Sequence, residues 1–340
     1  MSGTITRRDA LAINLGTLVL GGVGINNAHA WMPGPDENLV RDVTPGPMTI
    51  RLGSYLSRNE KETITDMVKR IRGGGFTGVI ASLDPWEAAS DSELSELKSA
   101  LREFDIVVFE VGGYRNILHT DEAERQKNLK HLAHCIEVAD KLGCPMVGTI
   151  SGSRNPDSNE FSDNYNVHPD NWTQKTWNLL VSGVKQILRD TSGMKASLGM
   201  EAQVTTNIDG PKAHRKLMDD VGDQRIKVNL DPTNMISLQT YFHTTELINE
   251  CFDLLGEDIF GCHAKDSFIL PHSQTVHVQE VCPGRGVLDY ETYLVRLSRM
   301  KWPRTLLPEH IPGDQFPEAY AYIRKVANKV GVKIHGEDTK

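Results

Sequence analysis

Four apolar stretches of this chain end on residues that carry charge or bind metals: SLGMEA (197–202), IKVNLDPTN (226–234), IFGCHAKD (259–266) and TLLPEHI (305–311). The residues concerned are Glu201, Asp231, His263 and Glu309. Burying such a group costs several kcal/mol unless it is paired or coordinates a metal. Successive members are separated by roughly 30 residues or more, which is the length of a strand, a helix and two loops. The spacing therefore predicts one metal ligand per βα unit.

The rest of the chain repeats this strand and helix alternation. Apolar runs predict strands at 49–55, 76–82, 105–112, 145–151, 196–202, 226–231, 259–264 and 304–309. Amphipathic segments predict helices at 60–73, 86–103, 120–142, 171–192, 211–221, 244–256, 289–300 and 315–331. Eight such pairs without an antiparallel tail favour the α/β class and a single (β/α)₈ TIM barrel over a doubly wound sheet.

Residues that begin and end helices support this assignment. The glycines at 73–75 and Gly143 stand where the first and third helices should end. Asp289 can cap the start of the seventh helix. In such a barrel the active site lies at the carboxyl ends of the strands, where the four polar residues are expected.

The first thirty residues have the pattern of an export signal. Arg7 and Arg8 precede a Gly-rich apolar run at 10–25, and Ala28-His29-Ala30 forms a cleavage site of the A-x-A type. The arginine pair favours the twin-arginine route, with an ordinary secretory signal as the alternative. We expect a signal peptide at 1–30, a lead-in at 31–48, the barrel at 49–331 and a tail at 332–340. The mature protein would then be periplasmic or secreted.

The composition excludes several classes of protein. With 39% hydrophobic and 24% charged residues the chain is an ordinary globular protein, and its one long apolar run is too short and too rich in glycine to span a membrane. Its net charge of −8, with no basic run, disfavours nucleic acid as a partner. The five cysteines contain no CxxC pair and are expected to be buried and free.

Three carboxylates and one imidazole, without a thiolate, form a donor set for a hard divalent ion such as Mn²⁺, Mg²⁺ or Co²⁺, and less well for Zn²⁺. Four protein ligands leave room for two substrate oxygens in an octahedral shell. An ion that chelates neighbouring carbonyl and hydroxyl oxygens makes the adjacent C–H more acidic. Each residue taken alone could instead be a helix cap or an ion-pair partner, but four on adjacent strands favour a metal site.

Together these residues resemble the xylose isomerase-like barrel superfamily of sugar isomerases and epimerases. The resemblance covers about residues 49–331, and it is carried by Glu201, Asp231-Pro232-Thr233-Asn234, His263-Ala264-Lys265-Asp266, Pro283-Gly284-Arg285-Gly286 with Asp289, and Glu309. The ketose 3-epimerase type is the most similar pattern. The resemblance implies that Glu201 and Glu309 are both metal ligands and the catalytic acid/base pair.

The chain also departs from that superfamily. Many relatives have histidine where this chain has Asn234. The AP endonuclease branch needs further histidines after strands two, three and four, but the chain has Ser82-Leu83-Asp84, Val111-Gly112-Gly113-Tyr114 and Thr149-Ile150-Ser151 there. A trinuclear zinc site, and DNA repair with it, are therefore not expected.

Five further residues are candidates for substrate binding: Lys265, Asp266, Arg285, Asn234 and Trp86. The alternatives are an ion pair between Lys265 and Asp266, a solvated loop position for Arg285 and ordinary packing for Trp86. His272 and His277 fall on a long loop that could form a lid over the site.

These features predict a divalent-metal enzyme that isomerises or epimerises a small, non-phosphorylated sugar or keto-sugar by removing a proton next to its carbonyl. A lyase is the alternative, since the same proton removal in a 3-keto-glycoside can expel the aglycone. A non-catalytic sugar-binding barrel is the alternative from another class. A phosphodiester hydrolase is least favoured, for want of histidines and positive charge.

We expect cleavage of the precursor after Ala30 and export that depends on the two arginines. Replacing both, Arg7→Lys with Arg8→Lys, preserves the charge but removes the twin-arginine signal, so the precursor should remain in the cytoplasm. N-terminal sequencing of the exported protein and immunoblots of cell fractions measure both expectations. Normal export of the double variant would indicate the general secretory route.

Overall fold

The computed structural model describes residues 42–157 and 166–337, so the predicted signal peptide lies outside the described residues. Eight parallel strands form a closed barrel in the order β1-β10-β7-β6-β5-β4-β3-β2. The strands are β1 Arg51–Tyr55, β2 Gly78–Ser82, β3 Val107–Gly112, β4 Met146–Ile150, β5 Ser197–Glu201, β6 Ile226–Leu230, β7 Ile259–Ala264 and β10 Thr305–Pro308. The predicted TIM barrel is confirmed.

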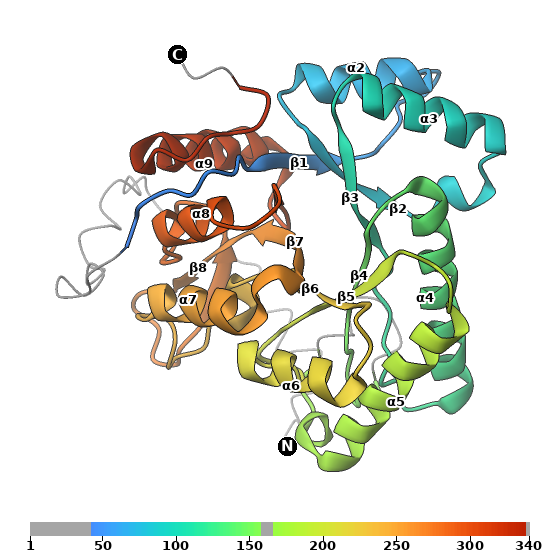
Figure 1. Cartoon of the computed structure of the whole chain (residues 1–340). Coiled ribbons are helices and arrows are strands. Elements are labelled where there is room, and N and C mark those ends of the chain that lie inside the picture. Colours follow the sequence, from blue (N-terminus) through green and yellow to red (C-terminus); the bar gives the residue numbers. More distant parts are fainter. Residues whose placement is uncertain (1–41, 158–165, 338–340) are drawn as a thin grey trace, which may run out of the picture. The chain divides into compact units, whose positions relative to one another are not determined.

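Helices surround the strands in Figure 1. Within the described residues they are α2 Ile64–Gly73, α3 Asp91–Glu103, α4 Glu122–Leu142, α5 Gln174–Asp190, α6 Pro211–Val221, α7 Thr244–Leu255, α8 Tyr290–Ser298 and α9 Phe316–Val330. Asp289 caps α8 as predicted, because its side chain accepts a hydrogen bond from the Thr292 amide. Gly143 ends α4 with a positive φ of 73°, a conformation that favours glycine.

The helix predicted at 86–103 is divided in two. Residues Trp86–Ala88 form a 3₁₀ turn, η2, and α3 begins only after Ser90. Ser90 and Glu93 form a capping box, in which each side chain bonds the other residue's backbone amide. This pair starts a new helix. The apolar residues of 86–103 keep a helical spacing across the interruption, so the sequence pattern alone does not reveal it.

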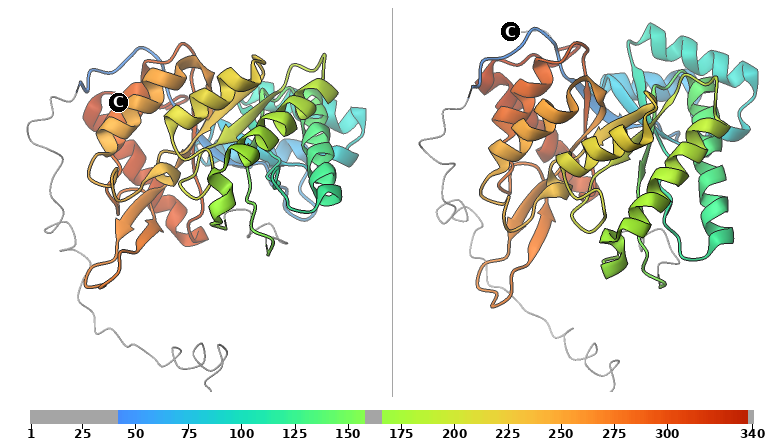
Figure 2. Two further views of the ribbon diagram at one scale, coloured as in Figure 1. Left: turned by 90° about the horizontal axis from the view of Figure 1, so that it is seen from below. Right: turned by 60° about the horizontal axis from the view of Figure 1, so that its bottom comes forward.

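An antiparallel hairpin interrupts the regular alternation, which corrects the prediction of a plain loop after the seventh strand. Strand β8 (Asp266–Ile269) pairs with β9 (Val278–Val281), from Asp266 opposite Val281 to Ile269 opposite Val278. Figure 2 shows this hairpin, in orange, projecting away from the barrel. Each strand has only four residues; β8 begins with the buried polar residues Asp266 and Ser267, and β9 is largely exposed, so neither has the apolar run that predicts a barrel strand. His272 and His277 lie in its exposed connection.

The segments predicted to flank the barrel pack against it where they are described. The Met48 amide donates to the Ser298 carbonyl at the end of α8, at 3.0 Å. Ile50 and Ile334 form a parallel bridge, and both side chains are buried. Residues 42–48 and 332–337 are therefore part of the barrel's packing.

The core consists of the apolar strands and the inner faces of the helices. All five residues of β4 and of β5 are buried, as expected for strands covered by helices. The five cysteines are free and buried, as predicted. In the part of the chain that is described, no helix has the length and apolarity needed to cross a bilayer.

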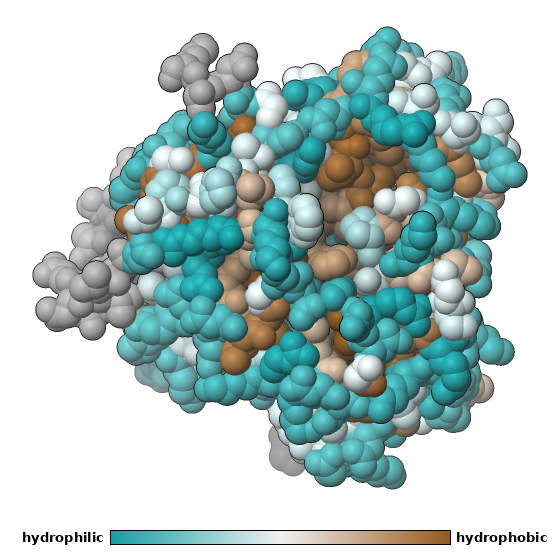
Figure 3. Space-filling model, viewed as in Figure 1, coloured by the Kyte–Doolittle hydropathy of each residue, from teal (hydrophilic) through white to brown (hydrophobic). Residues whose placement is uncertain are grey.

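A pocket of about 590 Å³ lies at the amino-terminal ends of the strands. Its lining includes Val107, Phe109, Phe260 and Trp302. Figure 3 shows the molecule from this side, with apolar side chains lining a hollow among polar ones. The predicted metal ligands belong to the opposite ends of the strands.

Replacement of Leu132 by alanine tests the packing of α4 on the barrel. The Leu132 side chain is fully buried, whereas Lys130 on the same helix is exposed. We expect Leu132→Ala to lower the free energy of unfolding by about 2–5 kcal/mol, because it removes apolar contacts and leaves a cavity. Lys130→Ala is the control and should change it by about 0.5 kcal/mol or less. Equal denaturation midpoints for the two variants would contradict this packing.

Candidate metal centre

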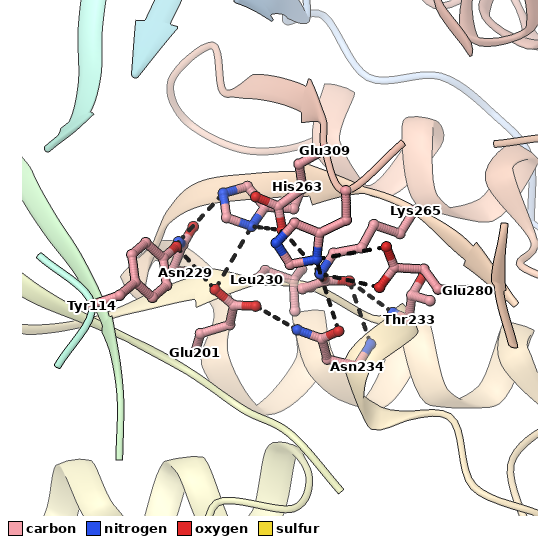
Figure 4. Close-up of polar contacts among 12 residues, drawn as sticks. Tyr114, Glu201, Asn229, Leu230, Thr233, Asn234, His263, Lys265, Glu280 and Glu309 are labelled. Carbon is pink, nitrogen blue, oxygen red and sulfur yellow. Dashed lines mark hydrogen bonds and ion pairs between the residues drawn. The ribbon is translucent and has the colours of Figure 1, made fainter. Parts of the chain in front are cut away.

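The four predicted ligands meet at the carboxyl ends of their strands. Glu201 is the last residue of β5, Asp231 follows β6, His263 is in β7 and Glu309 follows β10. One potential ligand atom from each lies within 4.8 Å of the others, and all four side chains are buried. Figure 4 shows Glu201, His263 and Glu309 pointing toward one another. The barrel thus brings together residues that are far apart in the sequence.

Hydrogen bonds and ion pairs hold these side chains in place. The Thr233 amide donates to Asp231 Oδ1 at 3.0 Å. His263 Nδ1 lies 3.0 Å from Glu309 Oε1 and 3.7 Å from Glu201 Oε2. The imidazole therefore lies between two of the carboxylates.

Lys265 and Asn234 belong to the same cluster. The Lys265 side chain is 1% exposed, and its Nζ lies 2.7 Å from Asp231 Oδ2 and 2.9 Å from Glu309 Oε1. Nζ also donates to Asn234 Oδ1 at 3.1 Å, and the Asn234 amide nitrogen donates to Glu201 Oε1. These two predicted substrate-binding residues therefore touch three of the four candidate ligands.

Two opposing effects set the pKa values of this cluster: burial disfavours the charged form of each group, and neighbouring opposite charges favour it. Burial raises the pKa of Glu201 to about 7. Burial also disfavours the charged form of Glu309, but His263 and Lys265 outweigh it and hold its pKa well below the ordinary value. Burial lowers the pKa of His263 and of Lys265, but the neighbouring carboxylates outweigh it, so both pKa values are raised.

The residues present fit a divalent cation. Asp231 Oδ2 and His263 Nδ1 are buried and make no hydrogen bond of normal geometry, although each lies at ion-pair distance from a neighbour. Both are atoms that can ligate a metal, a carboxylate oxygen and a ring nitrogen, and both are directed into the cluster without a hydrogen bond. Oxygen and imidazole donors are those that Mn²⁺, Mg²⁺ and similar ions accept.

A second layer of residues was not predicted. Glu110, in the middle of β3, places Oε2 at 3.2 Å from His263 Nε2. The Tyr114 hydroxyl lies 3.0 Å from Glu110 Oε1 and 3.1 Å from Glu201 Oε2. An acidic residue within the apolar run VVFEVG was the signal for Glu110, but it is not at the end of a strand.

The rim of the site also contains residues that the sequence did not indicate. His310 follows Glu309 with a positive φ of 55°, and its side chain is half exposed. Its Nδ1 lies 3.2 Å from Lys265 Nζ and 3.6 Å from Glu280 Oε1. Glu280 belongs to β9, so the hairpin supplies part of this rim.

Three of the residues predicted to bind substrate have other contacts. The buried Asp266 carboxylate accepts backbone N–H groups of Ser267, Gly284, Gly286 and Leu288 at 2.9–3.0 Å, which fixes the loop after β9. Arg285 forms an ion pair with Glu318 of α9 at the surface. Trp86 is 4% exposed, so its ring is covered by protein. These contacts favour a structural role for all three.

A family model described as the xylose isomerase-like TIM barrel matches residues 68–326, and the chain belongs to this family. The family resemblance drawn from the sequence is thereby confirmed. No curated protein matches the chain.

Solved structures share the fold. A xylose isomerase-like TIM barrel protein from Mycobacterium smegmatis in complex with magnesium is 16% identical, with 83% of this chain and 97% of that one covered and a TM-score of 0.57. The 3-keto-D-glucoside 4-epimerase from E. coli is 16% identical over 82% and 99%, with a TM-score of 0.55. A D-psicose 3-epimerase is 17% identical over 86% and 93%, with a TM-score of 0.56. At these identities the likeness concerns the fold.

Metal analysis of single variants tests the cluster. We expect His263→Ala to lower the affinity for Mn²⁺ by roughly tenfold or more, because changes even outside the ligand set have effects of that size. His277→Ala is the control, since this histidine is exposed on the hairpin. Isothermal titration calorimetry gives both affinities. Full retention of Mn²⁺ affinity in His263→Ala would exclude the site.

Proposed function

We propose that this protein is a divalent-metal-dependent isomerase or epimerase of a non-phosphorylated sugar. The observation that carries the proposal is the buried cluster of three carboxylates and one imidazole at the carboxyl ends of the strands. Glu201 and Glu309 reach it from β5 and β10, which are separated in the barrel by β6 and β7. Two carboxylates thus approach the same space from different sides.

Glu201, Asp231, His263 and Glu309 would hold the ion. When bound, the ion would polarise a substrate carbonyl and make the neighbouring C–H more acidic. In an epimerisation, one glutamate then removes the proton at that carbon, and the other returns a proton to the opposite face of the same carbon. Asn234 orients the Glu201 carboxylate, and Lys265, as the buried ammonium group, stabilises negative charge on a substrate oxygen.

The substrate class follows from the proposed site and the proposed export. Sugar phosphates are mainly intracellular, so an exported enzyme would meet free sugars and glycosides. The fold likeness to a D-psicose 3-epimerase and to a 3-keto-D-glucoside 4-epimerase supports a sugar or keto-sugar as substrate.

A lyase that acts on 3-keto-glycosides is the second candidate. Removal of the proton at C2, next to the C3 carbonyl, expels the group at C1. The observation that favours it is His310 at the rim, because an imidazole there can protonate the leaving oxygen.

Glutamine in place of either glutamate tests the mechanism. Glu201→Gln and Glu309→Gln keep the size and one oxygen ligand but remove the proton acceptor. We expect each to lower kcat by about 10²–10⁴ while part of the metal binding remains. Glu318→Gln, which changes an exposed carboxylate on α9, is the control and should leave kcat unchanged. Near wild-type kcat in both site variants would contradict the mechanism.

The reaction is identified by NMR in D₂O with free ketoses, aldoses and 3-keto-glycosides. An epimerase incorporates deuterium at the inverted carbon, whereas a lyase releases the aglycone and an unsaturated product. Sugar binding without turnover of any compound would favour the non-catalytic barrel.

A further inference from the structure

Glu110 is a buried carboxylate that the proposed reaction does not use. It lies within β3 and is 0% exposed. Among the described residues its carboxylate contacts the side chains of His263, Asn229 and Tyr114, and none of these is a lysine or an arginine. A buried carboxylate without a partner is strongly destabilising, so these contacts must compensate for its burial.

The barrel interior leaves room for this group. A Cβ atom on Gly148 of β4 would lie 2.0 Å from Glu110 Oε1. A Cβ atom on Gly261 of β7 would lie 2.4 Å from Asn229 Oδ1. Any side chain at these two glycines would displace the network, so the two strands are built around it.

The contacts on Glu110 determine how the His263 ring is oriented. Oε2 lies 3.2 Å from His263 Nε2 and accepts from Asn229 Nδ2 at 3.1 Å. The opposite ring nitrogen, Nδ1, faces Glu309 and Glu201 in the cluster. When Nε2–H donates to Glu110, a neutral ring presents the lone pair of Nδ1 to the cluster, which is the form that binds a metal.

We infer that Glu110 is a positioning residue that fixes His263 as the Nε2–H tautomer and directs Nδ1 to the metal. This inference rests on the proposed metal-dependent function. The Tyr114 hydroxyl connects Glu110 to a second candidate ligand, since it lies within hydrogen-bond distance of both Glu110 Oε1 and Glu201 Oε2. Glu110 therefore influences two of the four candidate ligands without touching the ion.

Glu110→Gln tests this role because an amide offers only one acceptor oxygen to three donors. We expect the Mn²⁺ affinity, measured by calorimetry, to fall by about 10–100-fold. In the Mg²⁺-loaded wild type, ¹⁵N and ¹H NMR should show His263 protonated at Nε2, with a slowly exchanging, downfield proton. That proton signal should move upfield or disappear in Glu110→Gln.

Thr149→Val is the matched control, because Thr149 is a buried polar residue of the neighbouring strand β4. It should leave the Mn²⁺ affinity and the His263 signal unchanged, whatever it does to stability. Wild-type Mn²⁺ affinity and an unchanged Nε2–H signal in Glu110→Gln would overturn the inference and leave the metal site standing. Failure of the wild type itself to bind metal would instead refute the proposed function.

If Glu110→Gln does not fold, the NMR spectrum of the wild-type protein alone still tests the inference, because it shows which nitrogen of His263 carries the proton. A His263 ring protonated at Nδ1, with Nε2 bare in the Mg²⁺-loaded protein, would overturn the inference by itself. The variant Tyr114→Phe then separates the two branches of the network. It should retain the Nε2–H signal, because the bond from His263 to Glu110 remains.

Discussion

The balance of charge inside the barrel is the constraint on which the site depends. The carboxylates of Glu110, Glu201, Asp231 and Glu309 are all buried. His263 contacts three of them and Lys265 contacts two. If the four carboxylates are ionised and His263 is neutral, as a metal ligand must be, Lys265 offsets one of the four negative charges and a divalent cation would offset two more. The same electrostatics that makes the cluster costly to bury makes it attractive to a metal ion.

The topology makes this concentration of charge feasible. Parallel strands place their carboxyl ends at one mouth of the barrel, so each βα unit contributes a side chain without a long connection. The interior below that mouth is adapted to it, since Gly148 and Gly261 leave space for Glu110 and Asn229. The β8–β9 hairpin then adds Glu280 beside His310, outside the regular pattern. The barrel strands therefore supply the candidate ligands, and the β8–β9 hairpin supplies part of the rim.

The sequence predicted the fold and the grouping of the four candidate ligands, because strand ends can be located from apolar runs and all meet at one mouth. It did not indicate Glu110, whose relation to His263 depends on two strands facing each other across the barrel. It also missed the hairpin, since its two strands of four residues each are too short and too polar to form an apolar run. Asp266 and Arg285 were predicted to bind substrate from their places in the sequence, close after His263 and directly after Gly284. In the structure the partner of Asp266 is the loop after β9, and the partner of Arg285 is Glu318 of α9. Such partners depend on tertiary packing.

One divalent ion should bind among Glu201, Asp231, His263 and Glu309. Anomalous diffraction from crystals of the protein grown with Mn²⁺ locates such an ion. We expect a single strong anomalous peak in the barrel mouth, roughly 2.0–2.2 Å from an oxygen or nitrogen atom of each residue. A peak bound elsewhere, or no peak at saturating Mn²⁺, would contradict it.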